Sequence, residues 1–118
     1  MPANDAIHDA VVSALRKDGW TVTDDPLTIE FEGLYLFVDV GATRAVAAER
    51  DDRLIAVEIK SFPSKSAVAD LQQAIGQFVV YRTVLETVEP RRKLYLAISS
   101  EVQQRVFSSP RSGSSATG

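Results

Sequence analysis

Three charged residues adjoin apolar segments of the chain, where charge is costly unless it is paired or used. Glu58 and Lys60 end one such segment, and in a strand both point to the same face of the sheet. Asp39 directly follows another, residues 34–38. On adjacent strands, the two carboxylates and the carbonyl of Ile59 would form an oxygen-rich pocket suited to Mg²⁺ or Mn²⁺. The Lys60 ammonium would then orient an attacking water or stabilise charge developing on a phosphate, and the neutral amine form could help to deprotonate the water.

The same charges also have a purely structural interpretation. Glu58 and Lys60 could form a cross-sheet ion pair, or the strand end could simply reach solvent, and spacing alone does not separate these from a site. Asp39 favours the site, because it adds a second carboxylate at the end of a neighbouring strand. Glu49 is a further carboxylate, but hairpin alternation would place it opposite Ile55, on the face away from Glu58, so we leave it out.

The elements that must position these residues follow from apolar spacing and turn signals. The sequence predicts a first helix capped by Asn4 and stopped by Gly19. It then predicts strands at 27–31, 34–38 (buried on both faces), 45–49, 54–60 and 93–98, a long helix at 66–87, and a short helix from Ser100 that carries Phe107. This order indicates one α/β domain, a mixed sheet flanked by helices over 1–107, with a disordered Ser/Gly-rich tail at 108–118.

The long helix is expected to bury a stripe on one side and to present a polar edge on the other. The apolar stripe predicted for the core is Val68, Leu71, Ile75, Phe78 and Leu85. Gln77 and Tyr81 are four residues apart and project from the same side, so both could face a site. Arg82 falls within the apolar stripe, where it either reaches solvent or pairs with a carboxylate or a phosphate.

The amino-acid composition excludes several types of functional site and of protein. The 118 residues include no cysteine, which excludes a Cys-ligated zinc site and a thiol nucleophile. The net charge of −3 argues against a protein that coats nucleic acid by bulk electrostatics, although residues 1–60 carry −6 and the remainder +3. The sequence has neither a recognisable signal peptide nor a membrane-length apolar run, so we expect a cytoplasmic protein that does not bind membranes.

The order of these residues resembles the PD-(D/E)xK nuclease superfamily, which has the restriction-endonuclease-like fold. Asp39 is followed nineteen residues later by Glu58-Ile59-Lys60. His8 on the first helix, and Gln77 with Tyr81 as Q-x-x-x-Y on the long helix, match the RecB-type branch of that superfamily. Val38 stands where the motif has proline, a position at which proline is often absent.

At the level of the family, residues 2–100 resemble XisH, the excision-controlling factor of the cyanobacterial fdxN element. The resemblance is carried by 4–11, 15–20, 37–39, 57–62 and 76–77. It departs from the family after Glu101–Phe107, where XisH-like chains usually continue into another strand and this chain has its Ser/Gly tail.

The resemblance implies a role for each site residue. Asp39 and Glu58 would be ligands of Mg²⁺ or Mn²⁺ and would act in catalysis with Lys60. His8 would be an additional metal ligand, and Gln77 and Tyr81 would contact the site or the nucleic acid backbone.

The resemblance also implies partners: DNA, an XisI-like companion protein and a site-specific recombinase. A domain with so little basic surface would also need a partner or a second copy, as a homo-oligomer, to hold DNA. Two functions follow. One is a nuclease-like, Mg²⁺-dependent DNA endonuclease acting in recombination, and the other is a non-catalytic regulatory subunit of the same fold that binds a partner protein or DNA. A fold in which Glu58 and Lys60 form only a structural pair is the third interpretation.

Overall fold

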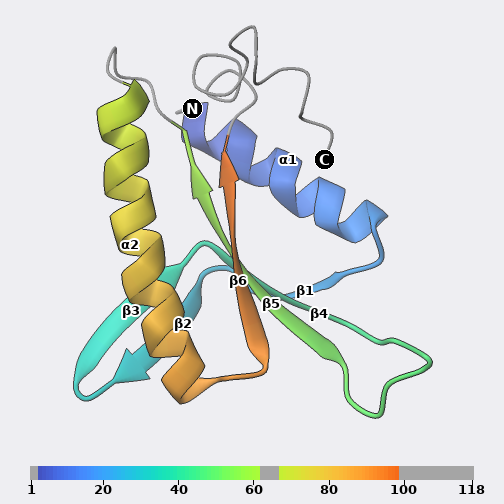
Figure 1. The fold of residues 1–118 in the computed structure, drawn as a ribbon. Helices are drawn as coiled ribbons and strands as arrows, with labels where there is room; N and C mark the ends of the chain where they lie inside the picture. Colours follow the sequence, from blue (N-terminus) through green and yellow to red (C-terminus); the bar gives the residue numbers. More distant parts are fainter. Residues whose placement is uncertain (1–2, 62–66, 99–118) are drawn as a thin grey trace, which may run out of the picture.

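Two helices and six strands make up the part of the chain that the structure, a computed structural model, describes: residues 3–61 and 67–98. In chain order they are α1 (Ala3–Lys17), β1 (Thr21–Asp24), β2 (Leu27–Phe31), β3 (Leu34–Val38), β4 (Val40–Arg44), β5 (Arg53–Lys60), α2 (Ala67–Val88) and β6 (Arg92–Ile98) (Figure 1). They form one compact domain of mixed α/β content, as the sequence predicts. None of the described helices is long and apolar enough to cross a bilayer.

The main sheet is mixed, in the order β1-β4-β5-β6. The strands β1, β4 and β5 are antiparallel neighbours, whereas β6 runs parallel to β5. A parallel neighbour requires a crossover connection, and α2 provides it. The carboxyl ends of β5 and β6 therefore lie at the same edge of the sheet, next to the amino-terminal end of α2 (Figure 1).

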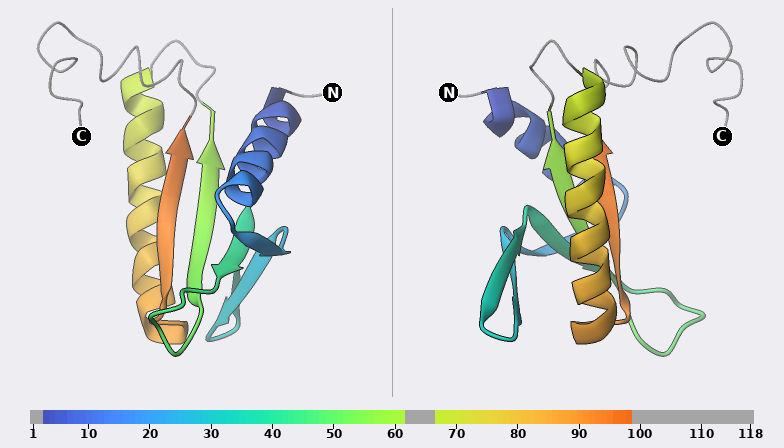
Figure 2. Two further views of the ribbon diagram at one scale, coloured as in Figure 1. Left: turned by 90° about the vertical axis from the view of Figure 1, so that its right-hand side faces the viewer. Right: turned by 60° about the vertical axis from the view of Figure 1, so that its left-hand side comes forward.

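The two helices cover opposite faces of this sheet (Figure 2, left). On one face, Val12 of α1 packs with Val40, Ala42, Ile55 and Val57. On the other face, Leu85 of α2 packs with Ala56, Leu94 and the inner side of the β2–β3 hairpin. Alternation along β5 therefore sends Ile55 and Val57 towards α1 and Ala56 and Glu58 towards α2, which confirms the predicted separation of Val57 from Glu58.

The first helix ends where the sequence predicts. Gly19 follows the helix with a φ of +91°, a left-handed conformation that glycine adopts without strain and that commonly closes helices. Trp20 then packs against the core on the α1 side of the sheet. The guanidinium of Arg44 lies 4.5 Å from the centre of the Trp20 ring, and this contact joins the end of α1 to β4.

The strand at 34–38 is confirmed, but the prediction that it is buried on both faces is wrong. Among the described strands β3 pairs only with β2, in a separate two-stranded hairpin whose turn has positive φ at Glu32 and Gly33. Val38 is buried, whereas Tyr35 and Phe37 are more than half exposed. The hairpin stands away from the main sheet, so only its inner face is covered and its outer face remains open to solvent.

The strand predicted at 45–49 is also wrong. The partner of β5 is β4, with Val40 opposite Val57 and Ala42 opposite Ile55, and residues 45–49 belong to the connection between these strands. Strand β1 was not expected from the sequence either. Gly41 allows the end of β1 to approach β4 closely, because a Cβ there would lie 3.3 Å from side-chain atoms of both Asp24 and Leu27.

The long helix is confirmed, but the side of it that is buried differs in part from the prediction. Leu71, Phe78 and Leu85 do pack against the sheets. Ala74 is buried instead of Ile75, and Val68 is exposed. The helix is apolar on more than one side, so spacing alone could not select the buried face. The expected short helix at Ser100–Phe107 and the tail at 108–118 lie outside the described residues.

Replacing Leu85 by alanine is expected to destabilise the domain by about 2–5 kcal/mol, because the Leu85 side chain is 2% exposed and joins α2 to both sheets. Urea unfolding followed by circular dichroism measures the change. Val80→Ala, at a position on the same helix that is 56% exposed, is the control and should change the free energy of unfolding by less than about 1 kcal/mol. Equal losses in the two variants would contradict this core assignment.

Candidate functional site

Asp39 and Glu58 meet at the carboxyl end of β5 through two reciprocal hydrogen bonds. The backbone N–H of Ile59 donates to Oδ2 of Asp39 at 2.7 Å. The backbone N–H of Asp39 donates to Oε1 of Glu58 at 3.4 Å. Asp39 lies in the short bend between β3 and β4, one residue before the pair Val40–Val57, so strand register brings it level with Glu58. The two carboxylates predicted from the sequence are therefore neighbours.

Two further predicted residues converge on Glu58. The ammonium of Lys60 lies 3.2 Å from Oε2 of Glu58. The side-chain amide of Gln77, from α2, donates to the same oxygen at a longer distance of 3.5 Å. We call Asp39, Glu58, Lys60 and Gln77 the carboxylate cluster. It joins β5, the bend before β4 and α2, and its two carboxylates and one ammonium carry a net charge of −1.

The Glu58 carboxyl is the buried member of this cluster, with the residue only 7% exposed. Burial raises the pKa of Glu58 above its ordinary value of 4.5, and the nearby Asp39 carboxylate raises this pKa further. The Lys60 ammonium and the Asp39 N–H lower it, but less than burial and Asp39 raise it. The fold thus holds Glu58 where its charged form is disfavoured, which is typical of functional sites but also occurs in structural ion networks.

His8 is held by a different partner. Its Nε2 lies 2.8 Å from Oδ1 of Asp25, and its Nδ1 lies 3.8 Å from the carboxylate of Asp9. Asp25 follows Asp24, which pairs with Gly41, two residues beyond Asp39. His8 and Asp25 therefore lie at the same end of the sheet as the carboxylate cluster, but none of the contacts found in the described part of the chain joins His8 to the cluster.

Tyr81 projects towards the hairpin. Its ring packs, partly buried, with Ile29, Leu36 and Val38. It has no contact with the carboxylate cluster among those found for residues 3–61 and 67–98. Arg82 is exposed, with its guanidinium 5.8 Å from the centre of the Phe78 ring. Of the two outcomes left open for it, Arg82 reaches solvent.

Glu49 lies away from the cluster, as expected, but for a different reason. It is not in a strand and is not opposite Ile55, whose partner is Ala42. Instead the Glu49 carboxylate accepts hydrogen bonds from Arg53, with 2.9 Å between Nη2 and Oε2. The Arg53 guanidinium lowers the pKa of Glu49.

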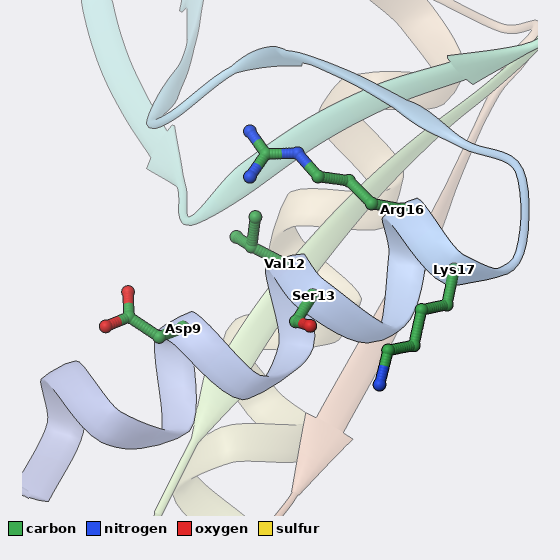
Figure 3. Close-up of a pocket in the computed structure, with 5 residues that line it drawn as sticks. All are labelled: Asp9, Val12, Ser13, Arg16 and Lys17. Atoms are coloured by element: carbon green, nitrogen blue, oxygen red, sulfur yellow. The ribbon is translucent and has the colours of Figure 1, made fainter.

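An open concave surface lies elsewhere, along α1, and its described lining residues are Asp9, Val12, Ser13, Arg16 and Lys17 (Figure 3). It shares no residue with the carboxylate cluster. Arg16 and Lys17 point in different directions from the helix, so their charges do not converge on one point (Figure 3). This surface lacks the gathered cations that binding a phosphate group would need.

Two hydrogen-bond partners of the predicted site residues were not expected from the sequence. The N–H of Ile59 is a donor to Asp39, although only the carbonyl of Ile59 was considered as a ligand. Asp25 was not among the residues singled out from the sequence, yet it is the partner of His8. Both depend on strand register: the pairing of β4 with β5 sets Asp39 beside Ile59, and the pairing of β1 with β4 brings residue 25 towards this end of the sheet.

Comparison with known proteins decides the family. The sequence model of XisH, described as the XisH protein, matches residues 1–116. The chain belongs to the XisH family. The match extends past residue 100, where the resemblance seen in the sequence ended.

Two solved structures are similar to this XisH-family chain. One is a crystal structure of an fdxN element excision controlling factor protein from Anabaena variabilis, with 40% sequence identity and a TM-score of 0.74, over 93% of this chain and 81% of the other. The second is an XisH family protein from Nostoc punctiforme PCC 73102, with 38% identity and a TM-score of 0.72, over 92% and 80% of the two chains. A search of curated proteins found no match.

The raised pKa of Glu58 predicts how stability depends on pH in this XisH-family domain. The folded state binds the Glu58 proton more tightly than the unfolded state, so the contribution of Glu58 to stability is largest below pH 4.5 and is lost as the pH rises through the folded-state pKa. Glu58→Gln keeps a neutral side chain throughout. We therefore expect this variant to be more stable than the wild type at pH 7, with a difference that shrinks as the pH falls through the folded-state pKa and is smallest below pH 4.5.

Urea unfolding from pH 4 to 8 checks this expectation. Glu86→Gln, which removes an exposed carboxylate from α2, is the matched control for the loss of one negative charge. A Glu58→Gln variant that is less stable than the wild type at pH 7 would show that the bonds from Lys60 and Gln77 outweigh burial and the Asp39 charge.

Proposed function

We propose that this chain is an excision-controlling factor of the XisH type, with a restriction-endonuclease-like domain that acts on DNA by Mg²⁺-dependent phosphodiester hydrolysis during site-specific recombination of a mobile element. The observation that carries the proposal is the carboxylate cluster, in which Asp39, Glu58 and Lys60 meet at the end of β5. The Anabaena variabilis neighbour is named as an fdxN element excision controlling factor, which supports the biological setting.

The arrangement of the elements supports the endonuclease-like fold. Antiparallel strands lead into β5, a helix follows, and a parallel strand returns beside it, so the charged residues end a central strand. In that position Glu58 and Lys60 project from the face covered by α2, where Gln77 reaches Glu58.

The cluster fits a hard divalent cation. Asp39 and Glu58 supply two adjacent carboxylates, and Mg²⁺ is commonly held by one or two carboxylates together with water and substrate phosphate oxygens. A cation there would offset the burial and the mutual repulsion that raise the pKa of Glu58. No group of three or more His, Cys, Asp or Glu residues is found among residues 3–61 and 67–98, so the rest of the shell would come from water and substrate.

The residues of the carboxylate cluster would then have distinct roles in the reaction. When bound, the cation would polarise the scissile phosphate and lower the pKa of water. Lys60, 3.2 Å from Glu58, would stabilise negative charge that develops on the phosphate. Gln77 would hold the Glu58 carboxylate in place and contact the substrate backbone.

His8 and Tyr81 have weaker support as site residues. For His8 to become an additional ligand through Nε2, it would have to exchange its bond to Asp25 for one to the cation. For Tyr81 to contact DNA, its hydroxyl would have to extend past the apolar contacts of its ring. We therefore place Asp39, Glu58 and Lys60 in the catalytic role and keep the other two as peripheral contributors.

Metal binding and cleavage test the proposal together. Titration calorimetry with Mn²⁺ is expected to give one site in the wild type and a loss of affinity in Asp39→Asn, because only one carboxylate remains. Cleavage of duplex, single-stranded and branched DNA in Mg²⁺ or Mn²⁺ should fall by about 100-fold or more in Lys60→Met, as when a group that stabilises transition-state charge is removed.

Asp51→Asn, in the exposed connection between β4 and β5, is the control for removing a carboxylate and should behave as the wild type. A folded wild-type protein that neither binds Mn²⁺ nor cleaves any of these DNAs would rule out the nuclease. The Glu58–Lys60 pair would then be structural or regulatory.

A second function is favoured by a different observation, the open outer face of the hairpin. Tyr35 and Phe37 lie on that face with Glu30, and Glu32 forms the turn, so an aromatic surface is combined with acidic rather than basic charge. Exposed apolar patches mark interaction sites, and acidic charge disfavours the DNA backbone. This surface supports the alternative of a non-catalytic regulatory subunit that binds an XisI-like companion protein.

Phe37→Ser is expected to weaken binding of an XisI-family protein at least tenfold, because buried aromatic residues dominate binding energies. Tyr95→Ser, at an equally exposed aromatic position on β6, is the control. Biolayer interferometry measures both. Binding that is unchanged by Phe37→Ser would remove the hairpin from the interface, and binding to labelled duplex DNA alone would favour the nuclease.

A further inference from the structure

The outer face of α2 has the composition of a covered surface. Helices that face water carry charged residues on their outer side, whereas helices that are apolar all round are usually buried. From residue 68 to residue 81, none of the exposed residues of α2 is charged: they are Val68, Ala69, Gln72, Gln73, Ile75, Gly76, Val79 and Val80. The opposite side of the helix is already packed against β6 and the hairpin.

We propose that a second copy of this chain covers this face, with α2 packed antiparallel against α2 of the second copy about a twofold axis near Gln77 and Phe78. This axis makes the face complementary to itself. Gly76 lies opposite Val79 of the other copy, and Ile75 lies opposite its Val80. In such an interface each contact occurs twice, so a small number of complementary residue pairs is enough to form it.

Gly76 provides the space that this packing needs. A Cβ built at Gly76 would meet, within 4 Å, no described atom beyond the neighbouring residues and backbone of its own helix, so the surface beside it is open. Small residues allow two helices to approach closely, and the side chain of Val79 from the second copy would fill the position above Gly76. Because Val79 is 44% exposed in the single chain, it is available for this contact.

The charges at the ends of the face fit the antiparallel arrangement. Arg82 would lie opposite Gln73 of the second copy, and Glu86 opposite its Ala69, so like charges do not meet. A parallel arrangement would instead set Arg82 beside Arg82 and Glu86 beside Glu86, which costs energy. The uncharged face also distinguishes this surface from the acidic, aromatic hairpin that we assign to a different protein.

The size of the face sets the expected affinity. Stable interfaces bury about 800 Å² per partner, more than one helix face of this length provides. We therefore expect a weak, concentration-dependent dimer. Sedimentation velocity from about 10 μM to about 1 mM, the range in which weak complexes form, measures it.

Val79→Lys is expected to raise the dimer dissociation constant at least tenfold, because it places a charge in an apolar contact near the axis. Tyr95→Lys is the matched control, since Tyr95 is a similarly exposed apolar side chain on the face of the sheet away from α2. Circular dichroism of both variants confirms that each is folded, so that a loss of dimer is not a loss of structure.

Single cysteines test the orientation, because the chain has no cysteine of its own. At 1.5 Å per residue, the two copies of residue 79 would be about 4.5 Å apart along the helix axes, whereas the two copies of residue 88 would be about 31 Å apart. Mild oxidation should therefore cross-link Val79→Cys and leave Val88→Cys monomeric.

Three results would overturn the proposal. The first is a wild-type protein that stays monomeric up to about 1 mM, as it would if another part of the chain covered this face. The second is a dimer as sensitive to Tyr95→Lys as to Val79→Lys. The third is equal cross-linking at positions 79 and 88, which indicates parallel or nonspecific contact.

Discussion

The reciprocal bonds between Asp39 and Glu58 tie together the parts of this fold that lie far apart in the sequence. The Asp39 carboxylate accepts a hydrogen bond from the N–H of Ile59, which follows Glu58 in the chain. The Glu58 carboxylate accepts one from the N–H of Asp39 itself. They meet where the pairing of β4 with β5 ends and where the hairpin departs from the main sheet. Because Glu58 is buried, a misplacement of either strand would leave a charge without partners, which is strongly destabilising.

This constraint accounts for the position of α2. The helix must cover the apolar residues of β5 and β6 while bringing one polar side chain to Glu58. Gln77 meets that need, and Ala74, one turn before it, allows close packing against β6. The crossover helix that covers this face of the sheet therefore also buries the Glu58 carboxylate and supplies one of its hydrogen-bond donors.

The sequence predicted that Asp39, Glu58 and Lys60 lie together, but not which residues surround them. The strand period placed Glu58 and Lys60 on one face, but the strand expected to bring Asp39 beside them, 34–38, lies in the separate hairpin, and β4 is the strand that pairs with β5. The partners of His8 and the packing of Tyr81 depended on β1 and on the hairpin, whose positions are set by tertiary contacts. A run such as 34–38, apolar on both faces, looks the same whether its second face meets the protein or a partner, so its exposure could not be derived from periodicity.

Gly41 shows how far the requirements of the site extend beyond its chemical groups. This residue carries no functional side chain, but its backbone passes so close to Asp24 and Leu27 that a methyl group would require them to move. Asp39 is two residues away on the same rigid strand connection, and Asp24 adjoins the residue that holds His8. A substitution at Gly41 would therefore disturb the carboxylate cluster indirectly, through Asp24 and Leu27, and a mutational scan of the cluster would extend into the sheet behind it.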